Sequence, residues 1–246
     1  MKVVFMHIPK CAGTSVHQLL KKNFKNDDFF SERLNFLDKY SVDELESKKV
    51  FSGHYDAWRI GHIPGSKFVF TFMREPQKRV VSLYNFWRSH TWSAIEKYEL
   101  GGPKLAKSNS FVDFLKIGDQ GIPANVENVM TRMAIGRTES PEVINLLEQQ
   151  PNKAYDVALN YYKSLNYVGI VENIDVSVRQ LSSMLCLKDG QISHANETKT
   201  TSLPSTRESV PPIEICDEAS SLLSDLTAID QKIYNYFNEA FFCPEL

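Results

Sequence analysis

The residues with the clearest chemical potential lie between a strand-like run, Val3 to Ile8, and an amphipathic helical pattern. The connecting segment, KCAGTS, combines a lysine, two small residues and two hydroxyls. Small residues let the backbone approach an anion, and the first N–H groups of a helix favour negative charge. The pattern predicts a phosphate or sulfate site, although an ordinary capped turn is the alternative. The predicted anion-binding residues are Lys10, Cys11, Ala12, Gly13, Thr14 and Ser15.

This segment differs from the phosphate loop of nucleoside triphosphatases. In G-x-x-x-x-G-K-[ST] the lysine follows a glycine and a Mg²⁺-binding hydroxyl comes next. Here Lys10 precedes Gly13 by three residues. The difference counts against a kinase or other phosphotransferase that uses ATP and Mg²⁺, but that class stays open.

A second basic segment follows the apolar run KFVFTFM. Arg74 comes at the end of this predicted strand, and Arg79 and Ser82 share one face of the helix that Pro76 begins. Because ligands bind beyond the carboxyl ends of parallel strands, a second anion site is plausible here. The alternative is a pair of solvated surface arginines.

A histidine, His54, follows a third strand-like run, Lys49 to Gly53. Imidazole is the side chain best suited to take a proton near neutral pH. At the same edge of a parallel sheet as both candidate anion sites, His54 is a candidate general base. A structural histidine is the alternative, and the other histidines form no metal-ligand pattern, so no metal is expected.

The chain alternates between strand and helix patterns, which predicts an α/β fold with a mostly parallel central sheet. Tyr167 to Val171 supplies the fourth strand, and helices are expected from Gln77 to about Trp92 and from Val176 to Leu185. Ser140 and Pro141 form a cap and a first-turn proline for a further helix.

We expect one domain over residues 1–246. A helical insertion is predicted at about 108–165, because the strand signal disappears there. A long polar loop at about 187–212 has the length of a functional lid or a poorly ordered segment. Helices are predicted over 213–243, opened by Pro211 and Pro212.

The net charge of −2 conceals an asymmetry. Residues 1–107 hold 18 Lys and Arg against 11 Asp and Glu, whereas residues 108–246 hold 10 against 19. The positive first part indicates an anionic ligand. A non-catalytic nucleotide or polyanion binder is therefore a further alternative, although no nucleic-acid motif is present. Four scattered cysteines, no apolar run long enough to span a bilayer and no signal-like start predict a cytoplasmic protein.

These segments together resemble the carbohydrate sulfotransferases of the heparan sulfate 2-O-sulfotransferase type. The resemblance rests on PKCAGTS at 9–15, GHY at 53–55 and FMREP at 72–76 followed by RVVSLY, and it extends to NVMTR, VGIVE and KTTSLP. It covers roughly residues 5–205. The chain departs from the family pattern at Cys11 and Ala12, where Thr and Gly are common.

The resemblance implies a P-loop-like three-layer fold that binds 3′-phosphoadenosine-5′-phosphosulfate (PAPS) and releases adenosine 3′,5′-bisphosphate. By this resemblance, Lys10 to Ser15 would hold the 5′-phosphosulfate, with Lys10 also catalytic, and Arg74 and Ser82 the 3′-phosphate. His54 would be the catalytic base. The loop residues expected to close over the nucleotide are Lys199, Thr200 and Thr201.

The acceptor is expected to be a hydroxyl, most simply on a glycan. Tyr55, Trp58 and Arg132 are candidate acceptor contacts. Arg132 could equally form a salt bridge, and burial in the core is the alternative for the aromatic residues. The sequence does not define the oligomeric state.

Overall fold

The computed structural model describes residues 1–188 and 204–242. Its sheet has four parallel strands in the order β2-β1-β3-β4, which confirms all four predicted strands and the α/β class. Almost every strand residue is buried, as expected for a sheet covered on both faces. The strands are β1 (Lys2–Met6), β2 (Val50–Gly53), β3 (Lys67–Met73) and β4 (Tyr167–Ile170).

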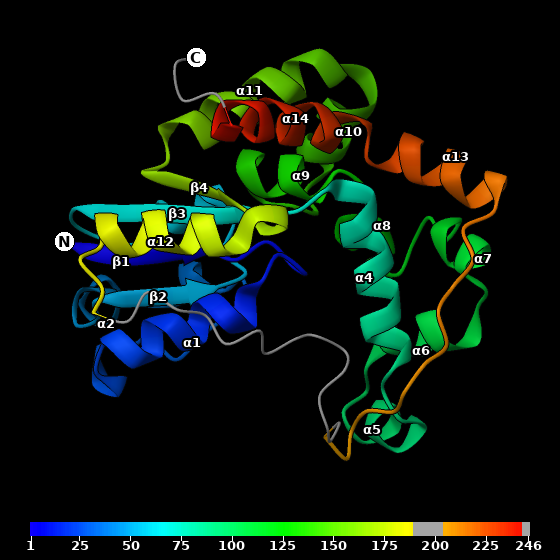
Figure 1. Cartoon of the computed structure of the whole chain (residues 1–246), viewed down its shortest axis with the longest axis horizontal. Helices are drawn as coiled ribbons and strands as arrows, with labels where there is room; N and C mark the ends of the chain where they lie inside the picture. The colour runs from blue at the N-terminus through cyan, green and yellow to red at the C-terminus, as the bar shows by residue number, and fades with distance from the viewer. Residues whose placement is uncertain (189–203, 243–246) are drawn as a thin grey trace.

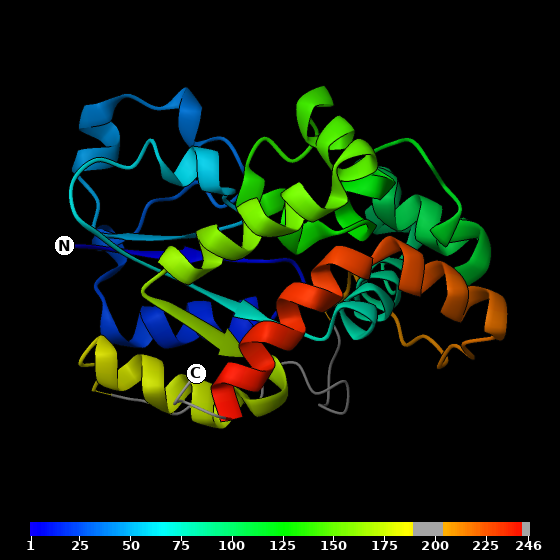
Figure 2. The same ribbon diagram turned by 90° about the horizontal axis from the view of Figure 1, so that it is seen from above.

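Helices cover both faces of the sheet, which gives three layers (Figures 1 and 2). Two helices, α1 (Gly13–Asn23) and α12 (Ile174–Met184), lie on one face, and α9 (Val129–Ile135) and α11 (Pro151–Ser164) lie on the other. The final helix, α14 (Ala228–Phe242), packs against α11, α9 and β4. Short helices α2 (Val42–Glu46), α3 (Ala57–Ile60) and α10 (Pro141–Gln149) complete this part.

A second hydrophobic core forms around α4 (Pro76–Arg88), which stands across the end of the sheet (Figure 1). The other helices of this core are α6 (Gly101–Ser108), α7 (Phe111–Leu115), α8 (Ile122–Val126) and α13 (Asp217–Leu226), and α5 (Trp92–Lys97) packs on α6. The helical stretch predicted over 108–165 is therefore shared between two cores: α7 and α8 pack near α4, whereas α9 and α11 pack on the sheet.

Capping residues and prolines in the sequence predict most helix boundaries correctly. Pro76 begins α4, and the Ser140 side chain accepts a hydrogen bond from Val143 N at the start of α10. The helix predicted to reach Trp92 ends at Arg88, because Thr91 caps a new helix. The C-terminal helix predicted to open at Pro211 and Pro212 begins only at Asp217, and Cys216, in extended backbone, is its N-cap.

Candidate active site

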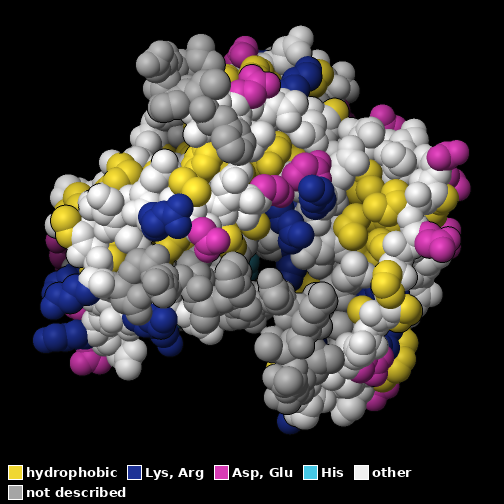
Figure 3. Space-filling view, in the orientation of Figure 1, with side chains coloured by type: hydrophobic (Ala, Val, Ile, Leu, Met, Phe, Trp, Pro, Cys, Tyr) yellow, Lys and Arg dark blue, Asp and Glu magenta, His cyan; other side chains and the backbone are white. Residues whose placement is uncertain are grey.

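All four strands end on one large cavity of about 2400 Å³ that lies between the sheet and α4. Figure 3 shows the hollow, with Lys and Arg side chains gathered along it. The segments that follow β1, β2, β3 and β4 contribute His7, His54, Arg74 and Val171, respectively, to its wall. Parallel strands thus bring together residues far apart in the sequence, as expected for a ligand site at the carboxyl ends of a sheet.

The loop that follows β1 reaches the cavity through backbone in the left-handed region. Lys10 has φ 69° and Ala12 has φ 55°, and Ala12 is the N-cap of α1. No side chain of the described residues caps this helix end. The start of α1 therefore faces the cavity with a partial positive charge, which suits an anion. The predicted loop residues that line the cavity are Lys10, Ala12, Gly13, Thr14 and Ser15.

Lys10 lies in a cationic and partly apolar environment. Its Nζ and the guanidinium carbon of Arg207 each lie 3.8 Å from the centroid of the Phe86 ring, a cation–π arrangement. Burial, followed by the charges of Arg207 and Arg74, lowers the pKa of Lys10 to about 8. An anion bound between these three cations would favour the protonated lysine.

Arg74 and Ser82 both line the cavity, but Arg79 does not. Arg79 is fully buried, and its guanidinium donates to the carbonyl oxygens of Asn125 and Val126 at the end of α8. The proposal that Arg79 belongs to a second anion site is therefore wrong. Its side chain ties α8 to α4, because buried carbonyls need donors.

His54 projects from the end of β2 into the cavity wall. Its Nδ1 lies 2.9 Å from the carbonyl oxygen of His7, and its backbone N–H donates to Arg33 O. A carbonyl only accepts, so Nδ1 donates and the neutral ring leaves Nε2 without a proton. Burial lowers the pKa of His54 below its usual value, against the effect of the His7 carbonyl, and Arg33 adds to the lowering. The ring is thus a neutral base.

Trp58 lines the cavity beside Arg137, whose guanidinium carbon lies 4.3 Å from the Trp58 ring centroid. The buried carboxylate of Asp56 holds this region together. It accepts hydrogen bonds from the Asn35 side chain, from Arg59 and from the backbone N–H of Arg137. Three chain segments are thereby fixed around Trp58.

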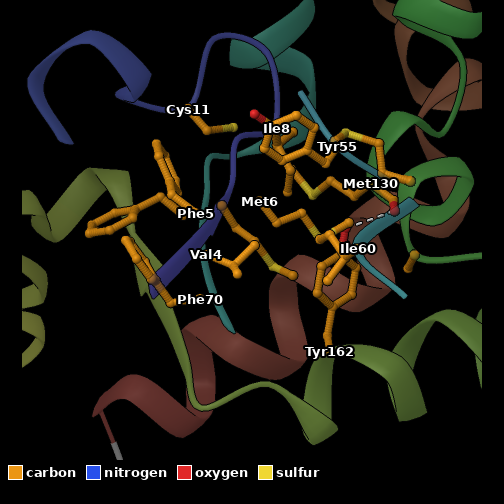
Figure 4. Close-up of a cluster of buried hydrophobic side chains, with 14 of the residues drawn as sticks. Val4, Phe5, Met6, Ile8, Cys11, Tyr55, Ile60, Phe70, Met130 and Tyr162 are labelled. Atoms are coloured by element: carbon orange, nitrogen blue, oxygen red, sulfur yellow. Dashed lines mark hydrogen bonds between the residues drawn. The ribbon is translucent and has the colours of Figure 1, made fainter. Parts of the chain in front are cut away.

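Three other predicted residues have structural surroundings. Tyr55 is fully buried, its hydroxyl donates to Glu32 O, and it packs in the sheet core with Cys11 (Figure 4). Arg132 is 2% exposed and pairs with Glu127. Neither lines the cavity, so the structure does not support Tyr55 and Arg132 as acceptor contacts. The Cys11 thiol points into the core, where burial raises its pKa to about 12, so only the Cys11 backbone remains available to an anion.

Sequence reasoning did not identify Arg33 and Arg207, which both line the cavity. A signal existed for Arg207, because it is the only Lys or Arg in residues 200–212 of the predicted lid. Arg33 lies in an irregular segment before η2 (Leu37–Lys39) and had no such signal. The predicted Lys199, Thr200 and Thr201 lie outside the described residues.

A parallel sheet whose adjacent strands β2, β1 and β3 end in a neutral histidine, a cationic loop and Arg74, respectively, is the arrangement of an α/β group-transfer enzyme. The family model described as "Sulfotransferase family" matches residues 1–237. The chain therefore belongs to the sulfotransferase family, which confirms the resemblance drawn from its motifs. A search of curated proteins found no match.

Within residues 1–188 and 204–242, no helix is long and apolar enough to cross a membrane. These residues also hold no group of three or more His, Cys, Asp or Glu side chains placed to bind a metal ion.

Proposed function

We propose that this protein transfers the sulfuryl group of PAPS to a carbohydrate hydroxyl, with His54 as the general base. The observation that carries the proposal is the single cavity lined by the Lys10–Ser15 loop, Arg74, Ser82 and His54. A cationic loop and a basic strand end in one cavity suit a donor that carries both a 5′-phosphosulfate and a 3′-phosphate, whereas a simple polyanion binder needs no base in that cavity.

The residues present fit such a donor. The uncapped start of α1 and the cation of Lys10 would hold the 5′-phosphosulfate, and Arg74 and Ser82 the 3′-phosphate. When bound, the nucleotide supplies an activated sulfuryl group on a phosphate leaving group. Arg207, on Phe86 beside Lys10, is a further contact that we assign to the donor side.

His54 supplies the proton transfer. Its Nε2 would take the hydroxyl proton as the acceptor oxygen forms a bond to sulfur. The bond from sulfur to the bridging oxygen then breaks, and the negative charge remains on the nucleotide phosphate. Lys10 and the first N–H groups of α1 lie on the wall where this charge would develop, so they would stabilise the transition state more than the ground state.

We assign the acceptor to the part of the cavity lined by Trp58, Arg137 and Leu34. An indole face at a cavity wall suits the apolar face of a sugar ring. This observation supports a carbohydrate acceptor, and Trp58→Ala is expected to raise KM for the acceptor with little effect on nucleotide affinity.

The test has two steps. Calorimetry would compare adenosine 3′,5′-bisphosphate with ADP, each with and without Mg²⁺. We expect the bisphosphate to bind at least about tenfold more tightly, independent of Mg²⁺, because only it carries a 3′-phosphate for Arg74 and Ser82 as well as a 5′-phosphate for the loop. Tighter, Mg²⁺-dependent binding of ADP would instead support a phosphotransferase and overturn the proposal.

The second step measures transfer of radiolabelled sulfate from PAPS to a panel of glycans. His54→Ala is expected to abolish transfer and to leave bisphosphate affinity unchanged, since His54 is neutral and is not among the residues assigned to the donor phosphates. His17→Asn is the matched control, because His17 is a partly buried histidine that does not line the cavity. Retained transfer in His54→Ala would remove His54 from its assigned role.

A further inference from the structure

His7 lies at the end of β1 in a column of stacked rings. Its imidazole stacks on His54 with centroids 4.3 Å apart and an interplanar angle of 27°, and on Phe5 at 5.3 Å and 24°. Phe5 in turn stacks on Phe70 of β3 at 5.1 Å. The column therefore runs from the packed core of the sheet to the candidate base, with His7 as its last member before His54.

The same residue also sets the tautomer of His54, because the His7 carbonyl accepts from His54 Nδ1. Strand register makes this possible: Met6 pairs with Gly53, and His7 N–H donates to Gly53 O, so the residues that follow are neighbours. The backbone of His7 thus orients the ring nitrogens of His54, while its side chain covers one face of the ring.

The edge of the His7 ring lies against the anion-binding loop. A Cβ added at Gly13 would lie 1.7 Å from His7 Nε2, so only glycine leaves room for this imidazole. His7 is consequently in contact with both halves of the site, the loop that begins α1 and the histidine at the end of β2.

A purely structural role does not explain the choice of histidine. His7 Nδ1 is buried and has no hydrogen-bond partner within the described part of the chain. An unpaired buried polar atom destabilises the fold, and an apolar side chain would fill the position without that cost. A polar ring at such a position therefore indicates a functional requirement.

We propose that His7 is a positioning residue for the sulfuryl transfer: its imidazole, held between Gly13 and His54, fixes the ring plane of the base relative to the donor loop and shields it from water. The inference rests on the proposed function, in which His54 is the base. Arg33, Lys10 and His17 are the charged or titratable groups that act on His7 besides His54, and Arg33 also acts on His54.

The first test needs no turnover. Long-range ¹H–¹⁵N NMR of the histidines would report the tautomer and pKa of His54 in the wild type and in His7→Ala. We expect the wild type to show protonated Nδ1 and a pKa below 6.5. In His7→Ala water reaches the exposed ring face, so the pKa of His54 should rise toward 6.5, while the backbone carbonyl of residue 7 keeps Nδ1 protonated. An unchanged pKa of His54 would overturn the inference.

The second test uses transfer kinetics with PAPS and an accepted glycan. His7→Ala is expected to lower kcat about tenfold or more and to move the acidic limb of the pH profile to higher pH. The KM for PAPS should change less than about threefold, because the loop cations remain. His7→Asn keeps a planar group beside His54 and should give an intermediate profile, and it also serves if His7→Ala folds poorly.

Controls separate this inference from the proposed function. His17→Asn removes a histidine from the neighbouring helix α1 and should leave the tautomer of His54 and the pH profile as in the wild type. If the wild type transfers no sulfate, the proposed function fails, and the NMR comparison still decides whether His7 positions His54. Normal transfer with an unshifted pH profile in His7→Ala would refute the positioning role alone.

Discussion

Asn128 and Asp230 cap each other's helices across about a hundred residues of sequence. The Asn128 side-chain oxygen accepts from the backbone N–H groups of Ile229 and Asp230 at 2.9 and 3.2 Å, at the start of α14. The buried Asp230 carboxylate accepts from the N–H groups of Met130 and Thr131 at 2.9 and 2.8 Å, at the start of α9. The two helix ends are therefore joined in one polar unit within the core.

Loss of either cap should destabilise both helices. Asn128→Ala and Asp230→Ala are each expected to lower the free energy of unfolding by about 2 kcal/mol, because buried N–H groups lose their acceptors. The double variant should lose clearly less than the sum. Urea denaturation would measure all three, with the exposed Asp225→Ala on α13 as control. Strict additivity would show that the two caps act independently.

Substitution of Arg79 should lower the stability of the fold, whereas substitution of Arg74 should weaken nucleotide binding. Arg79→Lys cannot reproduce the fork that reaches Asn125 and Val126, so we expect a loss of about 2 kcal/mol in stability. Arg74→Ala should keep the stability and weaken bisphosphate binding about tenfold or more. Thermal melting and calorimetry on both variants would test this contrast. It would be contradicted if folded Arg79→Lys bound the bisphosphate as weakly as Arg74→Ala does.

Nucleotide affinity should fall at alkaline pH. The pKa of Lys10 is lowered to about 8, so the free protein loses this positive charge as the pH rises above that value. A bound anion favours the protonated form, and affinity should then fall by up to about tenfold per pH unit. Lys10→Arg keeps its charge and should remove this dependence. Calorimetry would measure bisphosphate affinity between pH 7 and about pH 9.5 in the wild type and in Lys10→Arg. An equal loss of affinity with pH in both proteins would refute the prediction.

Stability should fall in mild acid because several histidines are held neutral. Burial, with the charges of Arg33 and Lys21, lowers the pKa of His17 from 6.5 to about 4. Between pH 6.5 and about pH 4, His17 binds a proton in the unfolded chain but not in the folded one. The contribution of neutral His17 to stability is therefore present above pH 6.5 and is lost as the pH falls toward 4. His7 and His54 act in the same direction, since burial also lowers their pKa values.

His17→Gln tests this linkage. Urea midpoints measured from pH 7 to about pH 4.5 should decline less steeply in His17→Gln than in the wild type. The exposed His62→Gln serves as the control and should follow the wild type. Identical slopes in His17→Gln and the wild type would mean that His17 takes up its proton equally in both states.

The features that sequence predicted well are those fixed by neighbouring residues. Apolar runs defined all four strands, and Pro76 and Ser140 marked the starts of their helices, because capping depends on residues within one turn. The loop from Lys10 to Ser15 was found for the same reason. Since parallel strands end on one edge, its approach to His54 and Arg74 followed from the fold class.

The errors came from contacts between distant segments. Nothing near Arg79 indicates that the end of α8, forty-six residues later, supplies its carbonyl partners. Tyr55 and Arg132 have residue types suited to binding a sugar, yet tertiary packing buries both. The role of His7 as the contact between Gly13 and His54 also depends on strand register, which a sequence pattern does not specify.

The Asp56 carboxylate makes the shape of one cavity wall largely independent of the side chains on it. It secures the segments of Asn35, Arg59 and Arg137 through buried hydrogen bonds, two of them to backbone N–H groups. Backbone donors do not depend on residue identity, so side chains on these segments can be exchanged while the scaffold keeps its shape. The loop after β1 shares none of these bonds. Substitutions on the segments that Asp56 holds can therefore alter this wall of the cavity and leave the loop after β1 in place.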